Sequence, residues 1–296
     1  MGAGLVRRLM RDGHTCVAYD VNAAAVKALA AFLLSVVCAA HAGAQPALVT
    51  LAEGTPKVLR GATWYKLVPG TALEEADIVT VGPKQQMQIE TASGSIVNVT
   101  GEATIVVTLA KDGALTLTMS AGFAKTAAKM PPVRMRTPQF DVIAGDAIVV
   151  AHADTAELFV EAGNAKFVDA AGAVRDAKRG EYWVKSGNAF ASRPLAPKAF
   201  VDALPRNYLD PLPSLASRIK SKPALVADHD ITYAEAEPWL AGKDRAAFEK
   251  RFAVRLRDPV FRKAVAPHVA RYPMWDRILY PEKYAPKTDE KAKEAK

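Results

Sequence analysis

The chain has 296 residues, half of them apolar and 24% charged, so it can bury the core of one or two domains. Its 18 glycines and 19 prolines are too few for a collagen-like or low-complexity chain, and two cysteines are too few for a disulfide scaffold or a thiolate zinc site. The formal net charge of +8 permits an anionic partner but identifies none.

The first 30 residues have the order helix, strand, acid, helix. Residues 2–13 suit a helix that ends at Gly13, residues 15–20 suit a short strand that ends in Asp20, and residues 23–30 suit a second helix. This order is the latter part of a dinucleotide-binding βαβ unit.

Within these residues, segments 1–3, 5–14 and 19–22 resemble the NADP-binding start of the 6-phosphogluconate dehydrogenase family. The resemblance implies an NADP-dependent oxidoreductase, with Gly2 as the third glycine of G-x-G-x-x-G and Asp20 near the ribose. The first strand and the first two glycines, which would bring backbone N–H groups to the pyrophosphate, are missing. We therefore expect a truncated Rossmann-like fragment over residues 1–27, joined by gene fusion or a misplaced start, and no bound cofactor.

Residues 28–40 form an uncharged apolar run between Lys27 and the small residues Ala42-Gly43-Ala44. A cation, a short apolar stretch and an A-x-A site are typical of a secretory signal peptide, and the run is shorter than the roughly 20 residues of a membrane span. A buried core helix is the alternative. We expect a periplasmic or secreted protein cleaved after Ala44, or after Ala42 as the second choice. Cleavage would remove both cysteines and lower the formal net charge to +6; an uncleaved chain would contact the membrane only through residues 28–40.

From Leu48 to about Pro194 the pattern changes to short strands separated by turns. The expected strands are residues 57–60, 64–68, 77–81, 87–91, 96–99, 103–109, 115–119, 139–143, 147–150, 157–161, 165–168 and 181–185. Asp112-Gly113 between two strand-like runs predicts a hairpin. This spacing favours a β-sandwich, barrel or β-roll over residues 45–195.

A second set of motifs lies in this region. The motifs are Gly54-x-x-x-Val58-x-Arg60-Gly61, Pro69-Gly70-x-x-Leu73, Asp77-x-Val79-Thr80, Ser93-Gly94-Ser95, residues 117–122, Arg136-Thr137-Pro138 and Val160-x-x-Gly163. Residues of about 50–192 are similar to the FecR domain, a family named for the iron-dicitrate sigma regulator. The resemblance implies a β-rich domain outside the cytoplasmic membrane that senses, binds or assists envelope assembly. No sigma-binding segment followed by a membrane span is evident, so an anti-sigma-type signalling regulator is a less favoured alternative.

The last third of the sequence predicts a helical domain over residues 196–285, after a linker at residues 194–197, and a disordered charged tail over residues 286–296. Thr232-x-x-Glu235 is a capping box, and Asp244 is an expected N-cap. Asp258-Pro259 is expected to begin a further helix, which Pro267 must break or kink.

Phe248, Phe252 and Leu256 recur at a spacing of four and form one apolar helix face. A helical segment of this size buries too little surface to be stable alone, so we expect the face to pack against the β domain. The alternative is a docking surface for another envelope protein.

Candidate chemical groups are few. Asp228-His229-Asp230 has side chains that suit zinc or manganese, but adjacent residues rarely converge on one ion, so a solvated loop is favoured and no metal site is assigned. His152 and His268 are isolated, and no G-x-S-x-G, H-E-x-x-H or complete P-loop is present. We assign no catalytic residue.

The helical region also carries many basic residues. They are Lys243, Arg245, Lys250, Arg251, Arg255, Arg257, Arg262 and Lys263. A solvated helix surface is the favoured interpretation, and the functional alternative is contact with an acidic envelope polymer, anionic lipid or nucleic acid. Export argues against nucleic acid as the partner. The sequence thus predicts an exported, non-enzymatic FecR-like binding or assembly module of the bacterial envelope, whose partner is an envelope polymer or another envelope protein.

Overall fold

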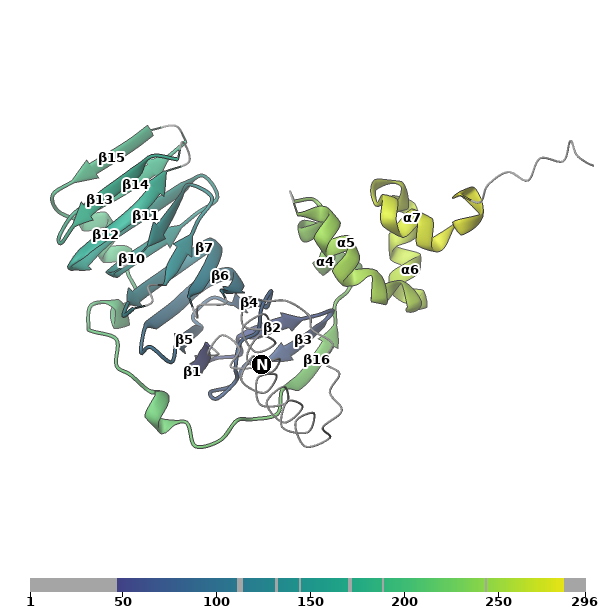
Figure 1. The fold of residues 1–296 in the computed structure, drawn as a ribbon, viewed down its shortest axis with the longest axis horizontal. Coiled ribbons are helices and arrows are strands. Elements are labelled where there is room, and N and C mark those ends of the chain that lie inside the picture. Colours follow the sequence, from purple (N-terminus) through teal and green to yellow (C-terminus); the bar gives the residue numbers. More distant parts are fainter. Residues whose placement is uncertain are drawn as a thin grey trace, which may run out of the picture. The chain divides into compact units, whose positions relative to one another are not determined.

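The computed structural model describes residues 47–110, 114–130, 133–143, 145–169, 172–187, 189–242 and 244–284, which belong to one compact unit. They form a mainly β structure followed by a helical region (Figure 1), which confirms the predicted fold class. The predicted Rossmann-like fragment with Gly2 and Asp20, the apolar run 28–40, the turn at Asp112-Gly113 and the tail 286–296 lie outside the described residues.

The β region is a 16-stranded sheet that folds into two layers around one core. Its two longest strands, β6 (Ile96–Leu109) and β7 (Leu115–Ala127), pair along their length and contribute to both layers. The first half of β6 and the second half of β7 lie in layer one with β1 (Leu48–Glu53), β5 (Gln86–Glu90), β10 (Asp146–Ala151), β11 (Thr155–Ala162), β14 (Tyr182–Ser186) and β15 (Ala189–Arg193). The other halves lie in layer two with β16 (Val226–Asp230), β3 (Thr63–Lys66), β2 (Lys57–Arg60), β4 (Ile78–Val81), β8 (Arg134–Arg136), β9 (Phe140–Ile143), β12 (Asn164–Asp169) and β13 (Val174–Lys178).

Two glycines lie where β6 and β7 pass from one layer to the other. Gly101 has a φ of +76° and Gly122 a φ of +109°, and the register between the strands shifts from Thr100 to Thr104. Glycine reaches positive φ without the steric cost of a Cβ, so both strands can bend there without ending. A Cβ on Gly122 would lie 2.5 Å from the Cβ of Ala103 on the facing strand. The bend therefore requires glycine at position 122.

Gly122→Ala is expected to lower the free energy of unfolding by about 2–3 kcal/mol, because a strained φ and a clash with Ala103 are added together. Thermal or denaturant unfolding measures the loss. Gly163→Ala is the matched control, because Gly163 also has positive φ (+64°) but nothing within 4 Å of its added Cβ. It should cost only about 1 kcal/mol. Equal losses in the two variants would contradict the close approach at Gly122.

The segment that follows β15 crosses the outer face of layer one, and we call residues 194–225 the strap. It contains α3 (Lys198–Ala203) and the short 3₁₀ turns η1 (Arg206–Tyr208) and η2 (Ala216–Arg218). Phe200 and Tyr208 are buried in one apolar cluster with Ile148, Val150 and Tyr182 of layer one. The predicted linker at residues 194–197 is thus the start of a longer covering segment.

After β16 the chain is helical. The elements are α4 (Tyr233–Leu240), α5 (Arg245–Phe252), η3 (Ala253–Arg257), α6 (Pro259–Val265), η4 (Ala266–Arg271), α7 (Pro273–Leu279) and η5 (Pro281–Tyr284). The predicted capping box at Thr232 and Glu235 is confirmed, as is the N-cap at Asp258 with Pro259 in the first turn. The prediction for Asp244 is wrong in detail: the residue occupies the N-cap position, but its side chain makes no capping hydrogen bond. The α-helix ends at Val265, just before Pro267, as expected.

The helical region packs against the outer face of layer two. Phe252 and Leu256 belong to one buried cluster with Leu59 and Ile78 of the sheet, which confirms that the apolar face packs against the β region. The docking alternative is wrong for Phe252, which is fully buried. Arg251 strengthens the contact, because its Nε, Nη1 and Nη2 donate to the carbonyl oxygens of Gly61, Ala76 and Leu59 at 2.7, 2.6 and 2.7 Å.

Candidate functional site

A pocket of about 470 Å³ with both polar and apolar lining residues opens on layer two, beside β16 and the first turn of α4. Its walls come from β2, β3 and β4, from the bend in the middle of β6 and from the turn after β4. The lining residues are Thr55, Lys57, Trp64, Thr80, Val81, Gly82, Pro83, Gln85, Glu102, Ala103, Thr104, His229 and Glu235. Segments far apart in the sequence therefore build one site.

His229 is held between two carboxylates at this pocket. Its Nε2 lies 2.9 Å from Glu235 Oε1 on α4, and its Nδ1 lies 3.0 Å from Asp228 Oδ2. Lys57 Nζ on β2 donates to the same Asp228 oxygen at 2.6 Å. We call these four side chains the His229 clamp. Since they come from β2, β16 and α4, the clamp ties the start of the helical region to the sheet.

The clamp shifts the pKa of its members in opposite directions. The Glu235 hydrogen bond raises the pKa of His229, partial burial opposes the shift, and Asp228 reinforces it. The pKa of Asp228 is lowered, mainly by the hydrogen bond from Lys57. Partial burial alone would raise the pKa of Glu235, but hydrogen bonds from Thr232 and His229 outweigh it and leave that pKa lowered. All three shifts favour the charged forms, so the clamp is an ionic arrangement.

Stability is expected to depend on pH through this clamp. Because the folded-state pKa of His229 lies above its unfolded value near 6.5, its contribution is complete below about pH 6.5 and is lost as pH rises through the raised pKa. The carboxylates contribute above their usual values near 4 and lose that contribution as pH falls through their lowered pKa values. The clamp is therefore strongest at about pH 5–6.

His229→Gln should lower the melting temperature most at mildly acidic pH, with a loss below about 1 kcal/mol because the ring is partly exposed. Melting curves of both proteins from acidic to alkaline pH measure the difference. His152→Gln, at an exposed histidine, is the control. A difference that grows as pH rises above neutrality would contradict the assigned direction.

Trp64 is the most buried side chain among the large residues of the pocket wall, with 7% of its surface exposed. Its indole Nε1 is buried, and no acceptor for it is found in the described part of the chain. A buried donor without a partner costs about 1–3 kcal/mol. The Trp64 N–H is therefore an unsatisfied donor of the core beside the pocket, closed to a ligand bound there.

The structure corrects one prediction at this site. Asp228-His229-Asp230 is not a solvated loop but part of β16, which pairs with β3. The three side chains do not converge, because Asp230 accepts hydrogen bonds from Thr63 and Arg255 instead. Within the described ranges, no group of three or more potential ligands could hold a metal ion. Of the two other histidines considered, His152 is exposed and His268 stacks on Tyr233.

Two charged residues of the sequence motifs, Arg60 and Asp77, bind each other in the structure. Arg60 donates to both carboxylate oxygens of buried Asp77, at 3.0 and 2.7 Å, and to Glu74. The Asp77 hydrogen bond raises the pKa of Arg60 further, so the guanidinium stays charged. This pair holds the loop before β4 against β2 and lies outside the pocket lining.

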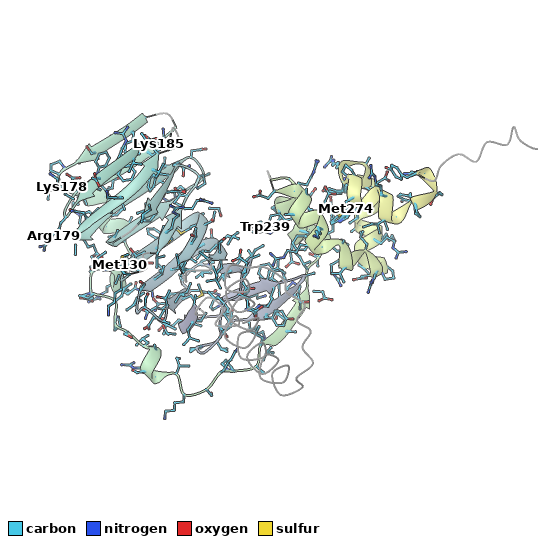
Figure 2. All side chains as sticks on the ribbon, viewed as in Figure 1. Met130, Lys178, Arg179, Lys185, Trp239 and Met274 are labelled. Carbon is cyan, nitrogen blue, oxygen red and sulfur yellow. The ribbon has the colours of Figure 1, made fainter. Side chains whose placement is uncertain are left out.

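Several basic residues of the helical region also have partners within the molecule. Arg251 binds sheet carbonyls, Arg255 pairs with Asp230 and Asp258, and Arg245 pairs with Glu249. They are therefore not merely a solvated helix surface. Lys243 lies outside the described residues. Other basic side chains lie elsewhere: Figure 2 shows Lys178, Arg179 and Lys185 at the end of the sandwich formed by β13 and β14.

No protein-family model matches the chain, and no curated protein matches it. Among solved structures, two crystal structures of a "putative anti-sigma factor" from Parabacteroides distasonis, at 2.50 and 1.65 Å resolution, match with 16% identity and TM-scores of 0.34 and 0.33. Each match covers 39% of this chain and 58% of the other. The chain thus spans less than two thirds of the length of these structures, and a likeness at this level assigns no function.

Sequence reasoning named Asp228 and His229 as neighbours and Glu235 as part of a capping box, but it did not connect them in one cluster or with Lys57. Lys57 and Asp228 are 171 positions apart, and they meet because β3 pairs with β2 on one side and with β16 on the other. Glu235 was recognised as a cap, and its second role follows from its place one turn from β16. Trp64 stood in an expected strand, and the sequence contained no signal that its indole N–H would lack a partner.

Proposed function

We propose that the chain is an exported, non-enzymatic binding module of a bacterial cell envelope, and that an envelope polymer or another envelope protein is its partner. The observation that carries the proposal is the His229 pocket. The strap and the helical region already cover apolar outer surface on the two layers, and the His229 pocket is one of the recessed surfaces that stay open to a ligand among the described residues. The FecR-like motifs and the signal-like run 28–40 give the proposed compartment.

The state of the pocket's titratable groups favours binding over catalysis. Both ring nitrogens of His229 are engaged by carboxylates, so neither is free to take a proton from a substrate. The ammonium of Lys57 is likewise bound to Asp228 at 2.6 Å. These groups hold the pocket walls together.

Export is tested by expressing the full chain in a bacterium with two membranes, separating periplasm from cytoplasm, and weighing the product by intact mass spectrometry. The expected periplasmic product begins at Gln45, or at Gly43 as the second choice. A double variant, Leu33→Arg with Leu34→Arg, should abolish export because it places charge in the apolar run. A chain that begins at Met10 serves as a second version, because the long preceding segment can itself impair export. Full-length protein found only in the cytoplasm for both versions would overturn the proposal.

The two alternatives are tested separately. The oxidoreductase alternative requires NADP binding, and calorimetric titration of the full chain with NADP should show none. The signalling alternative requires a membrane span and a cytoplasmic partner. The helices described here include none long and apolar enough to cross a membrane.

A further inference from the structure

We infer that a second pocket, in the helical region, binds a single-chain anionic amphiphile: an aliphatic acid whose carboxylate meets Arg257 and Arg262 and whose chain lies on apolar side chains. We call this site the Arg257 pocket. The inference goes beyond the proposed function and does not depend on the His229 pocket. It combines two observations: two guanidinium groups without acidic partners, and an apolar surface exposed beside them.

The Arg257 pocket has a volume of about 500 Å³ and is lined by residues of η3, α6 and α7, of which Figure 1 labels the two α-helices. Beside the two arginines, every lining residue is aliphatic, and no lining residue carries a carboxylate. The larger aliphatic residues are Val254, Leu256, Ile278 and Leu279. The volume lies in the range of small-molecule sites. A recess of this size suits one small molecule better than the flat surface of a membrane.

The two arginines of the pocket lack acidic partners within the described part of the chain. The carboxylate nearest in sequence, Asp258, is already engaged, because it accepts from Arg255 and from the backbone N–H of Val260. Arg262 Nε donates to the carbonyl oxygen of Leu256 at 2.9 Å, which fixes this guanidinium at the pocket, and no described residue accepts from its Nη atoms. A guanidinium matches the two oxygens of a carboxylate with paired hydrogen bonds. The arginines therefore favour an anionic head group.

The apolar lining favours a ligand with an aliphatic chain. Val254 is 53% exposed and Ile278 is 50% exposed, although both are branched aliphatic side chains. Leu256 and Leu279 lie beside them and belong to the apolar cluster of the helical region. Covering exposed apolar surface is favourable because it removes that surface from water. A small anion without a chain would leave this surface uncovered, and a cationic amphiphile would meet two guanidinium groups of like sign.

The test is a titration of the purified full chain, followed by calorimetry or ligand-observed NMR. The probes are decanoate, acetate and decyltrimethylammonium, each kept below the concentration at which it forms micelles. We expect saturable binding of decanoate with a Kd below about 1 mM, weakened by added salt because the arginines are exposed. Acetate and the cationic amphiphile should not bind in that range. No saturable binding of decanoate, or equal binding of either other probe, would overturn the inference.

Two variants locate the site. Arg257→Gln removes one guanidinium and should weaken decanoate binding about tenfold, and Ile278→Ser removes part of the apolar wall and should weaken it about fivefold. The matched controls are Arg271→Gln and Val260→Ser, at exposed residues outside the pocket lining, and they should leave the affinity unchanged. All four side chains are exposed, so the melting temperature should stay close to that of the unmodified chain. Unchanged affinity in either pocket variant, or an equal loss in its control, would overturn the assignment.

A membrane surface is the alternative occupant, and co-sedimentation with phosphatidylglycerol-containing vesicles tests it. We expect Arg257→Gln and Arg271→Gln to change vesicle binding by the same amount. A greater loss of vesicle binding in Arg257→Gln would assign the pocket to an anionic membrane surface and overturn the inference. These measurements use purified protein and do not depend on export, so an exported protein that binds no decanoate would keep the export proposal and overturn this inference alone.

Discussion

Phe252→Ala is expected to lower the free energy of unfolding by about 3–5 kcal/mol, through the lost burial of the ring and the cavity left behind. Phe252 is fully buried at the end of α5, in the cluster that joins the helical region to Leu59 and Ile78 of layer two. Its ring stacks on Phe248 with centroids 5.7 Å apart, and the guanidinium of Arg251 lies 5.8 Å from its centre. Removing the ring should therefore weaken the attachment of the helical region to layer two and also the packing inside the helical region.

Thermal and denaturant unfolding measure this loss. The control is Val260→Ala on α6, at a side chain that is 78% exposed, and it should change stability by less than about 0.5 kcal/mol. Limited proteolysis adds a second readout, since cleavage within residues 245–279 should become faster in Phe252→Ala. An unchanged melting temperature would contradict the core role of Phe252.

The sequence predicted strands best where one face of a strand is buried. In β11 the burial alternates along the strand: Ala156, Leu158 and Val160 are buried, and the residues between them are only partly buried. In β13 and β15 most side chains are exposed, so their sequences carry little alternation. β16 has the sequence VADHD, which lacks any apolar period, and it is a strand because the exposed edge of β3 pairs with it. Such pairing between distant segments leaves no local signal.

The bend in the sheet explains a second difference. Residues 96–99 and 103–109 were expected as separate strands, and Gly101 lies between them. The structure joins them in one 14-residue strand, β6, that serves both layers. A glycine can end a strand or bend it. Here β6 pairs with β7 on both sides of Gly101, which shows that the strand bends and continues. The pocket could not be predicted for the same reason, because its walls meet only after the sheet has folded into layers.

Buried Lys125 is the basis of the last prediction. The side chain lies on β7 beneath the strap and is 4% exposed. Its Nζ donates to the carbonyl oxygens of Tyr208 and Asp210 at 2.7 and 2.9 Å and pairs with Glu161 at 2.8 Å. All three donors of the ammonium are thus used. Two of them bind the backbone of a segment that has little regular structure of its own.

Lys125→Met should lower the free energy of unfolding by about 3 kcal/mol, because it leaves two strap carbonyls without a donor and Glu161 without its cation. The strap should also be released locally, so proteolytic cleavage within residues 194–225 should be faster than global unfolding allows. Lys220→Met is the matched control, since Lys220 is an exposed lysine of the same strap. It should leave both the melting temperature and the cleavage rate unchanged. A Lys125→Met protein with wild-type stability and an equally protected strap would show that the buried ammonium does not hold the strap on layer one.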